Sequence, residues 1–129
     1  MFTSRVHFFF WLLTQNKILT RNNVSKIKTI EDSRCLFCNK RESAVHLFFE
    51  CVVSKQMWLH ISDVVEISCG TDFGSIGKLW LSKRNVIANM FTSAALWGLW
   101  KLRNYICFQN GQWRDVQTML QRIAGLIHN

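Results

Sequence analysis

The stretch Cys35-Leu36-Phe37-Cys38, followed by His46-Leu47-Phe48-Phe49-Glu50-Cys51, decides how this chain is organised. Its cysteines and histidine form the pattern C-x2-C-x7-H-x4-C. Three thiolates and one imidazole can complete the tetrahedral sphere of a structural zinc ion, which leaves no position open for water or substrate. The two-residue gap suits a tight turn, and the four-residue gap suits a helical turn. We therefore predict a zinc-stapled binding module and not an enzyme, with Zn2+ held by Cys35, Cys38, His46 and Cys51.

The same cysteines allow other interpretations. Cysteine is often buried, so a C-x2-C pair can be two core thiols or a redox pair. A redox pair is expected beside a βαβ pattern, and no such pattern surrounds residues 30–50. A disulfide framework is typical of secreted chains with paired cysteines, whereas this chain has five. Cys69 and Cys107 lie outside the cluster, and we interpret both as small buried hydrophobes.

Composition indicates one helical, basic domain. A length of 129 residues is enough to bury a single core. The 49% hydrophobic content, with ten Phe and six Trp, excludes a disordered tail. Proline is absent and glycine is scarce, so long segments are free to be helical. The formal net charge of +8 favours an anionic partner, either nucleic acid or an acidic protein.

The basic residues are unevenly distributed along the chain. They gather in residues 1–40 and 81–129, whereas residues 41–80 are close to neutral. Those near the zinc pattern can contact phosphates, although a solvated basic face explains them as well. The candidate nucleic-acid-binding residues are Arg21, Lys26, Lys28, Lys40 and Arg41.

No segment is expected to cross a membrane. The longest apolar run, Phe8 to Leu13, is far shorter than the ~20 residues that a membrane helix needs. The N-terminal segment lacks the small-residue cleavage site of a signal peptide. We expect an intracellular chain, nuclear or cytoplasmic and not secreted, whose thiols stay reduced and free for metal.

Hydrophobic periodicity predicts a mainly α fold. We expect helices over residues 4–14, 21–27, 55–65, 86–109 and 113–127, with Thr20 before the second and Ser54 capping the third. Three glycines in residues 66–78 predict a loop there. We expect a zinc-stapled helical domain over 1–66 and a C-terminal helical pair over 79–129, either packed on it or separate. Leu19, Val24 and Ile27 should face inward.

The histidines and tryptophans outside the zinc pattern are given structural roles. His7, His60 and His128 lack metal-ligand spacing to one another, and we interpret them as core or surface residues. The tryptophans of the apolar helical positions could stack on bases, but core packing is the favoured interpretation. These tryptophans are Trp11, Trp58, Trp97 and Trp100.

Several motifs together resemble a known family. They are the run from Val6 to Leu13, Leu19-Thr20-Arg21-Asn22-Asn23-Val24, C-L-F-C, the run from Glu42 to Cys51, and Ser54-Lys55-Gln56-Met57-Trp58. The combination resembles the zinc-binding domain C-terminal to the reverse transcriptase of plant non-LTR (LINE-type) retrotransposons. It covers about residues 5–62, and the run from Leu96 to Asn104 looks like the helix that commonly follows that domain.

The resemblance implies that Cys35, Cys38, His46 and Cys51 hold zinc and that the domain helps a reverse transcriptase to bind template RNA or DNA. The adjacent catalytic aspartates of the polymerase are absent, so no two-metal magnesium site is expected. Three classes of function stay open: a nucleic-acid-binding zinc module, a protein-interaction module that can contact a reverse transcriptase domain, and a degenerate retroelement remnant without a selected function.

Overall fold

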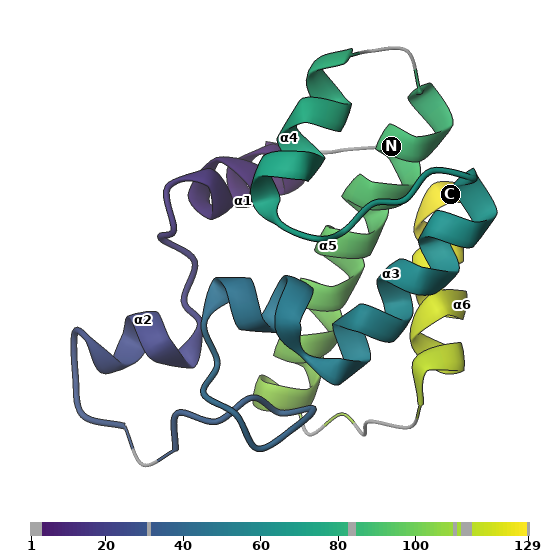
Figure 1. Cartoon of the computed structure of the whole chain (residues 1–129). Coiled ribbons are helices and arrows are strands. Elements are labelled where there is room, and N and C mark those ends of the chain that lie inside the picture. Colours follow the sequence, from purple (N-terminus) through teal and green to yellow (C-terminus); the bar gives the residue numbers. More distant parts are fainter. Residues whose placement is uncertain (1–3, 31, 83–84, 110, 112–114, 129) are drawn as a thin grey trace.

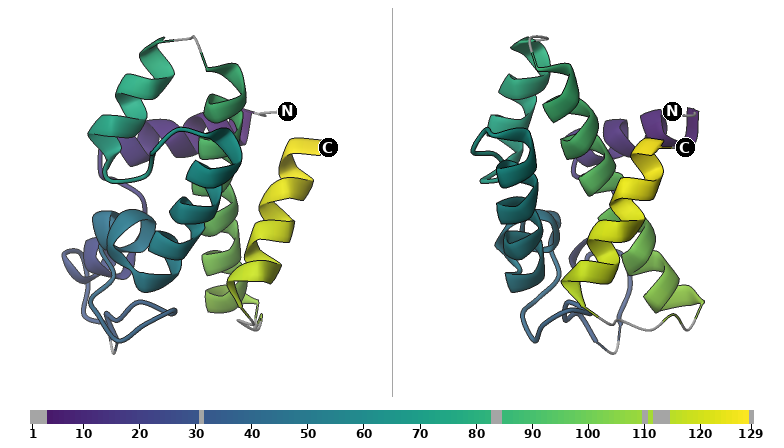
Figure 2. Two further views of the ribbon diagram at one scale, coloured as in Figure 1. Left: turned by 45° about the vertical axis from the view of Figure 1, so that its right-hand side comes forward. Right: turned by 90° about the vertical axis from the view of Figure 1, so that its right-hand side faces the viewer.

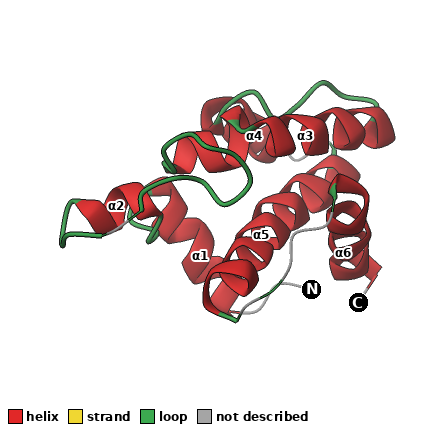
Figure 3. Cartoon of the chain, turned by 90° about the horizontal axis from the view of Figure 1, so that it is seen from below, coloured by secondary structure: helices red, strands yellow, loops and turns green. Residues whose placement is uncertain are grey.

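The protein is described by a computed structural model that covers residues 4–30, 32–82, 85–109, 111 and 115–128. Within these residues the structure is helical and contains no strand, as Figures 1 and 3 show. The mainly α prediction is therefore confirmed. The elements are α1 (Ser4–Thr14), α2 (Arg21–Ser25), the π-helical turn η1 (His46–Glu50), α3 (Val52–Val65), α4 (Phe73–Ser82), α5 (Val86–Phe108) and α6 (Val116–His128).

Helix α5 is the central element. It lies among α1, α3, α4 and α6 in Figures 1 and 2, and residues 92–96 along it are all buried. Phe9 of α1 packs against it, with ring centroids 5.1 Å from Trp97 and 6.2 Å from Trp100. One hydrophobic core includes residues of α1, η1 and α3 to α6. The division into 1–66 and 79–129 stays a prediction.

Helices α5 and α6 form the C-terminal pair that the sequence predicts. Met119 and Ile123 of α6 are buried. A Cβ atom on Gly98 would lie 2.9 Å from Cγ1 of Ile123, so glycine lets the two helices approach closely. The expected beginning of α6 at residue 113 and the expected Asn110-Gly111 helix end include residues outside the described ranges. None of the described helices is long and apolar enough to cross a membrane.

Helix α4 occupies much of the segment that we predicted to be a loop. The Asp72 side chain accepts a hydrogen bond of 2.7 Å from the backbone N–H of Ser75, which satisfies one free donor of the first turn. Ile76 is buried, and Trp80 donates from Nε1 to Oγ1 of Thr92 at 2.9 Å. The loop prediction holds for residues 66–72 and is wrong for 73–78, where this tertiary packing outweighs the helix-weakening effect of two glycines.

Helix α3 begins three residues earlier than predicted. Cys51, and not Ser54, stands at its N-cap position, and the Ser54 hydroxyl donates to the Cys51 carbonyl at 2.9 Å. Met57, Trp58 and Ile61 are buried as expected. The structure therefore joins the last residue of the zinc pattern directly to the first turn of a helix.

Some predicted core positions face solvent. Leu19 and Ile27 are exposed, whereas Ile18 and Thr20 are buried beside the beginning of α2. Leu19 was assigned to the wrong side: the N–H of Thr20 donates to the carbonyl of Ile18 at 2.9 Å, and this tight turn exposes Leu19 while both of its neighbours are buried. Thr20 does cap α2, since its hydroxyl accepts from the Asn23 N–H at 3.3 Å.

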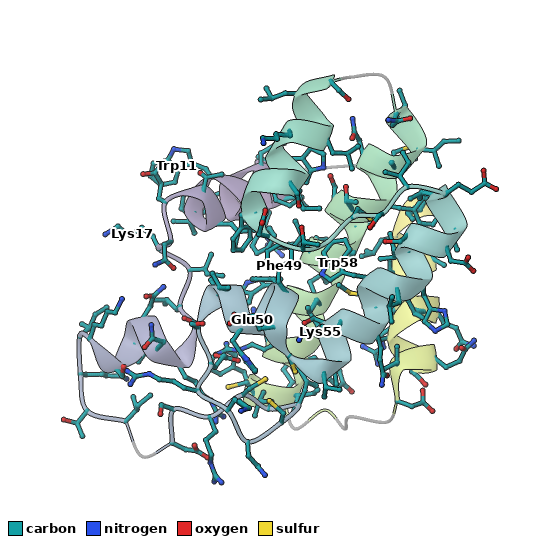
Figure 4. The ribbon with its side chains drawn as sticks, in the orientation of Figure 1. Trp11, Lys17, Phe49, Glu50, Lys55 and Trp58 are labelled. Atoms are coloured by element: carbon teal, nitrogen blue, oxygen red, sulfur yellow. The ribbon has the colours of Figure 1, made fainter. Side chains whose placement is uncertain are left out.

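The tryptophans fall into two groups. Trp58 is buried, and Trp97 and Trp100 are half-buried against the core. Trp11 is 58% exposed and stacks on the exposed ring of Phe8, so its assignment to the core is wrong. Figure 4 shows Trp11 projecting outward from α1. The first helix is apolar nearly all round, but α5 covers only one side of it.

Candidate metal centre

The first two cysteines lie on a narrow loop that is closed by backbone hydrogen bonds. The N–H of Cys35 donates to the carbonyl of Lys40 at 2.7 Å, and the N–H of Glu42 donates to the carbonyl of Ser33 at 2.9 Å. The N–H of Phe37 lies 3.5 Å from Cys35 Sγ and points a donor at that sulfur. The loop thus turns Cys35 and Cys38 toward one point, as the two-residue gap predicts.

The second ligand pair lies at the two ends of the π-helical turn η1. The N–H of Cys51 donates to the carbonyl of His46 at 2.7 Å, which closes a turn one residue wider than an α-helical turn. The hydroxyl of Ser43 accepts from the His46 N–H at 3.1 Å and caps the turn. This wider turn brings His46 and Cys51 to the same side and leads directly into α3.

Helix α3 packs against the π-helical turn through Trp58. Trp58 donates from Nε1 to the buried carbonyl of Phe48 at 2.6 Å. Its ring stacks on Phe49, with the ring centroids 5.8 Å apart and the ring planes 13° from parallel. Figure 4 shows Phe49 and Trp58 together in the interior, whereas Glu50 and Lys55 come from neighbouring positions at the surface. The indole thus supplies both a hydrogen bond and packing to the turn.

The four candidate ligands converge closely enough to hold one metal ion. Their ligand atoms all lie within 4.8 Å of one another. The Cys35 and Cys51 sulfurs are 3.9 Å apart, and Cys38 Sγ is 3.1 Å from Nε2 of His46. Zn–S bonds of about 2.3 Å place two sulfurs of a tetrahedral site about 3.8 Å apart. In the described part of the chain this is the one such group of three or more His, Cys, Asp or Glu residues.

The surroundings of Cys51 favour its thiolate. A hydrogen bond from the Cys35 thiol lowers the pKa of Cys51 to about 5, assisted by the N–H groups of Val53 and Ser54 and opposed by burial. The same hydrogen bond and burial raise the pKa of Cys35. Thiolate is the form that binds metal. A donor set of three sulfurs and one imidazole, partly ionised before metal arrives, suits a closed structural zinc site.

A buried ion pair connects the metal-binding loop to α5. Glu42 is fully buried, and its carboxylate accepts from Nε of Arg103 at 3.0 Å and from Nη2 at 2.6 Å. It also accepts from the backbone N–H of Arg21 at 2.7 Å. The Arg103 guanidinium lies 4.9 Å from the ring centre of Trp100. Sequence reasoning missed this pair, because the two residues are 61 positions apart and no local pattern connects them.

Of the five candidate nucleic-acid-binding residues, Arg21 is held by contacts within the fold, and the other four are exposed. Arg21 donates to the Arg34 carbonyl at 2.8 Å and lies 3.7 Å from Asp32. The other four are exposed around α2 and the cysteine loop, which lie together at one end of the molecule in Figure 1. They are Lys26, Lys28, Lys40 and Arg41, and within the described residues none of them is in an ion pair.

The geometry defines a zinc-binding domain. Comparison with protein families adds that residues 1–58 match the family described as zinc-binding in reverse transcriptase. The match covers the whole C-x2-C-x7-H-x4-C pattern, so the resemblance to a reverse transcriptase zinc-binding domain is confirmed over this segment, and zinc is its cofactor. No curated protein and no solved structure shows significant similarity to the chain.

Proposed function

We propose that this chain is a non-catalytic zinc-binding module, derived from a retrotransposon reverse transcriptase, that assists the binding of template RNA or DNA. The observation that carries the proposal is the group of exposed cations around the cysteine loop. Zinc bound by Cys35, Cys38, His46 and Cys51 would hold this loop, and so would fix the cations on either side of it. An ordered loop backbone lets these cations contact phosphates at a lower ordering cost, because only their side chains are then immobilised on binding.

The non-catalytic part of the proposal rests on the coordination chemistry. A tetrahedral site with four protein ligands has no open position for a water or a substrate. Phosphoryl transfer by two metal ions needs clustered carboxylates. The matched family is described by its zinc binding, which is a role separate from polymerisation. We therefore assign the metal to structure and the surrounding cations to binding.

The test compares two pairs of exposed lysines with the same total charge. Lys28→Ala/Lys40→Ala removes two cations beside the cysteine loop, whereas the control Lys55→Ala/Lys78→Ala removes two from α3 and α4. Binding of the zinc-loaded chain to a labelled single-stranded RNA is measured by fluorescence anisotropy over a series of salt concentrations. The loop variant should lower the slope of log affinity against log salt by about 1.4, at ~0.7 per lost contact.

The control decides between specific contact and net charge. If both lysine pairs lower affinity and slope equally, the cations beside the loop have no special role and the proposal is wrong. If the wild-type chain binds no RNA at low salt, the proposal is wrong, and the protein-interaction or remnant interpretation takes its place. Arg21 is left unchanged because its contacts with Arg34 and Asp32 are part of the fold.

A second function, contact with a protein, is favoured by the outer face of α1. Phe8 is 60% exposed and Trp11 is 58% exposed, and their rings are parallel within 12° at 6.2 Å. Paired exposed aromatic rings are typical of protein-interaction sites. The partner proposed for them is a reverse transcriptase domain. Phe8→Ser/Trp11→Ser should abolish co-purification with such a domain while RNA binding is kept, and unchanged co-purification would reject this function.

A further inference from the structure

A long groove lies between the beginning of α1, the second half of α5 and the end of α6. Its volume is about 690 Å³, and it is partly open to solvent. Arg5 borders it from α1, Trp97, Lys101 and Tyr105 line it from α5, and Arg122 lines it from α6. Figure 2 shows the N-terminal end of α1 near the C-terminal end of α6 in both views. Apart from Arg5, these residues lie outside the segment that matches the zinc-binding family.

The groove faces away from the metal-binding loop. Arg103 turns toward Glu42 of that loop and is buried, whereas Lys101 is exposed in the groove. Residues that are two positions apart on an α-helix differ by about 200° around its axis. The side chains of Lys101 and Arg103 therefore leave α5 in nearly opposite directions. The close crossing at Gly98 sets α6 against one edge of the groove.

Positive charge in the groove is not neutralised by its lining. Arg5, Lys101 and Arg122 are exposed, and no carboxylate is among the lining residues described. Two of these cations lie over aromatic rings: Lys101 Nζ is 5.9 Å from the centre of Trp97, and Arg122 Cζ is 5.1 Å from the centre of Tyr105. The groove therefore combines exposed cations with aromatic side chains.

We propose that this groove is a binding site for single-stranded nucleic acid, separate from the basic face beside the cysteine loop. The cations would contact phosphates, and bases would stack on the Arg122 guanidinium that covers Tyr105 and on the aromatic surface that the cations leave exposed. A duplex hides its base faces, so it cannot use the aromatic part of the groove. The proposal shares with the proposed function the premise that the chain binds nucleic acid, but it uses different residues and can fail separately.

The first test removes phosphate contacts from the groove. The zinc-loaded variant Lys101→Ala/Arg122→Ala is compared with Lys55→Ala/Lys78→Ala, which removes the same charge from other surfaces. Anisotropy titrations use fluorescein-labelled U15 and dT15 over a salt series. The groove variant should lower the salt slope by about 1.4 units, whereas the control should change it little. Equal behaviour of the two variants would overturn the proposal.

The second test separates stacking from charge. Tyr105→Leu removes a ring and keeps every cation, so affinity should fall about five- to a hundredfold while the salt slope is unchanged. Tyr105→Phe keeps the ring and should bind like the wild type. Zinc content and far-UV circular dichroism confirm that each variant is folded. Weak binding by both the Phe and Leu variants would count against stacking. If Tyr105→Leu does not fold, the lysine–arginine variant still decides the matter.

Competition distinguishes the ligand classes, and the loop variant distinguishes the two sites. Unlabelled U15 should displace the probe, whereas a duplex or poly-glutamate at equal phosphate or carboxylate concentration should displace it poorly. Equal displacement by poly-glutamate would overturn the assignment to nucleic acid. Loss of binding only in Lys28→Ala/Lys40→Ala would support the basic face beside the loop and reject the groove. Loss only in the groove variant would support the groove and reject that basic face.

Discussion

Replacing Arg103 by methionine should strongly destabilise the folded chain. The change removes the cation from a carboxylate that is fully buried, together with its two hydrogen bonds to that carboxylate, of 2.6 and 3.0 Å, and a third of 2.8 Å to the Asn104 side chain. Charge-assisted hydrogen bonds contribute about 1.5–3 kcal/mol each, and separating a buried ion pair costs about 3–5 kcal/mol. Glu42 would keep its 2.7 Å hydrogen bond from the Arg21 N–H, so we expect about 3–5 kcal/mol in total.

This loss is measurable by urea and thermal unfolding of the zinc-loaded chain. For a domain of this size it corresponds to a decrease in Tm of about 10–20 °C. The matched control is Lys101→Met, which removes an exposed cation from the same helix and should change stability by less than about 0.5 kcal/mol. A second check is the double variant Glu42→Gln/Arg103→Met. It should be about 1–3 kcal/mol more stable than Arg103→Met, because it no longer buries an unpaired charge.

Two results would refute this reasoning. One is an Arg103→Met variant that unfolds within about 1 kcal/mol of the wild type, since a buried unpaired carboxylate cannot cost so little. The other is a double variant whose loss of stability equals the sum of the two single losses. Additive losses would mean that Glu42 and Arg103 do not interact in the folded protein.

Three further predictions concern the metal centre, its packing and the non-catalytic proposal. Cys38→Ser should lose zinc and unfold the cysteine loop, because structural zinc contributes about 10–16 kcal/mol, whereas Cys69→Ser should keep its metal. Metal analysis and circular dichroism check both variants, and equal zinc contents in the two would contradict the assignment. Trp58→Phe should cost about 2–4 kcal/mol in urea unfolding, because it leaves the buried Phe48 carbonyl without its donor, and a loss below 1 kcal/mol would show that water replaces the indole. The purified chain should extend no primer, and extension that survives repurification would contradict the non-catalytic proposal.

The metal centre was predictable because its information is local. Four ligands within residues 35–51 need only a tight turn and a helical turn to meet. The two-residue gap indicates the first of these turns, and the four-residue gap indicates the second. The long Pro-free segment of α5 and the Thr20 cap of α2 were readable for the same reason. The sequence could not show that the second turn is π-helical. The wider turn depends on Trp58, whose hydrogen bond to the Phe48 carbonyl comes from the next helix.

The errors concern residues whose environment is set by distant parts of the chain. Helix α4 contains two glycines, and it is held by a buried Ile76 and by the contact of Trp80 with Thr92. The helix propensities of residues 73–82 do not indicate that contact, because it is made with α5. Trp11 was assigned to the core because its helix is apolar on most sides, but the number of sides covered depends on how many neighbours pack there. Only the tertiary structure shows which sides of α1 other helices cover.

The buried pair of Glu42 and Arg103 changes how the zinc-binding segment is understood. The two residues are 61 positions apart, and the second lies well beyond the segment that matches the family, residues 1–58. The backbone N–H of Glu42 donates to the Ser33 carbonyl and so closes the cysteine loop. The carboxylate of Glu42 accepts from the backbone N–H of Arg21 at the beginning of α2. Since α5 supplies the cation, the cysteine loop, α2 and α5 share one buried electrostatic contact. The metal can organise the loop locally, but the orientation of that loop on the rest of the protein depends on Arg103.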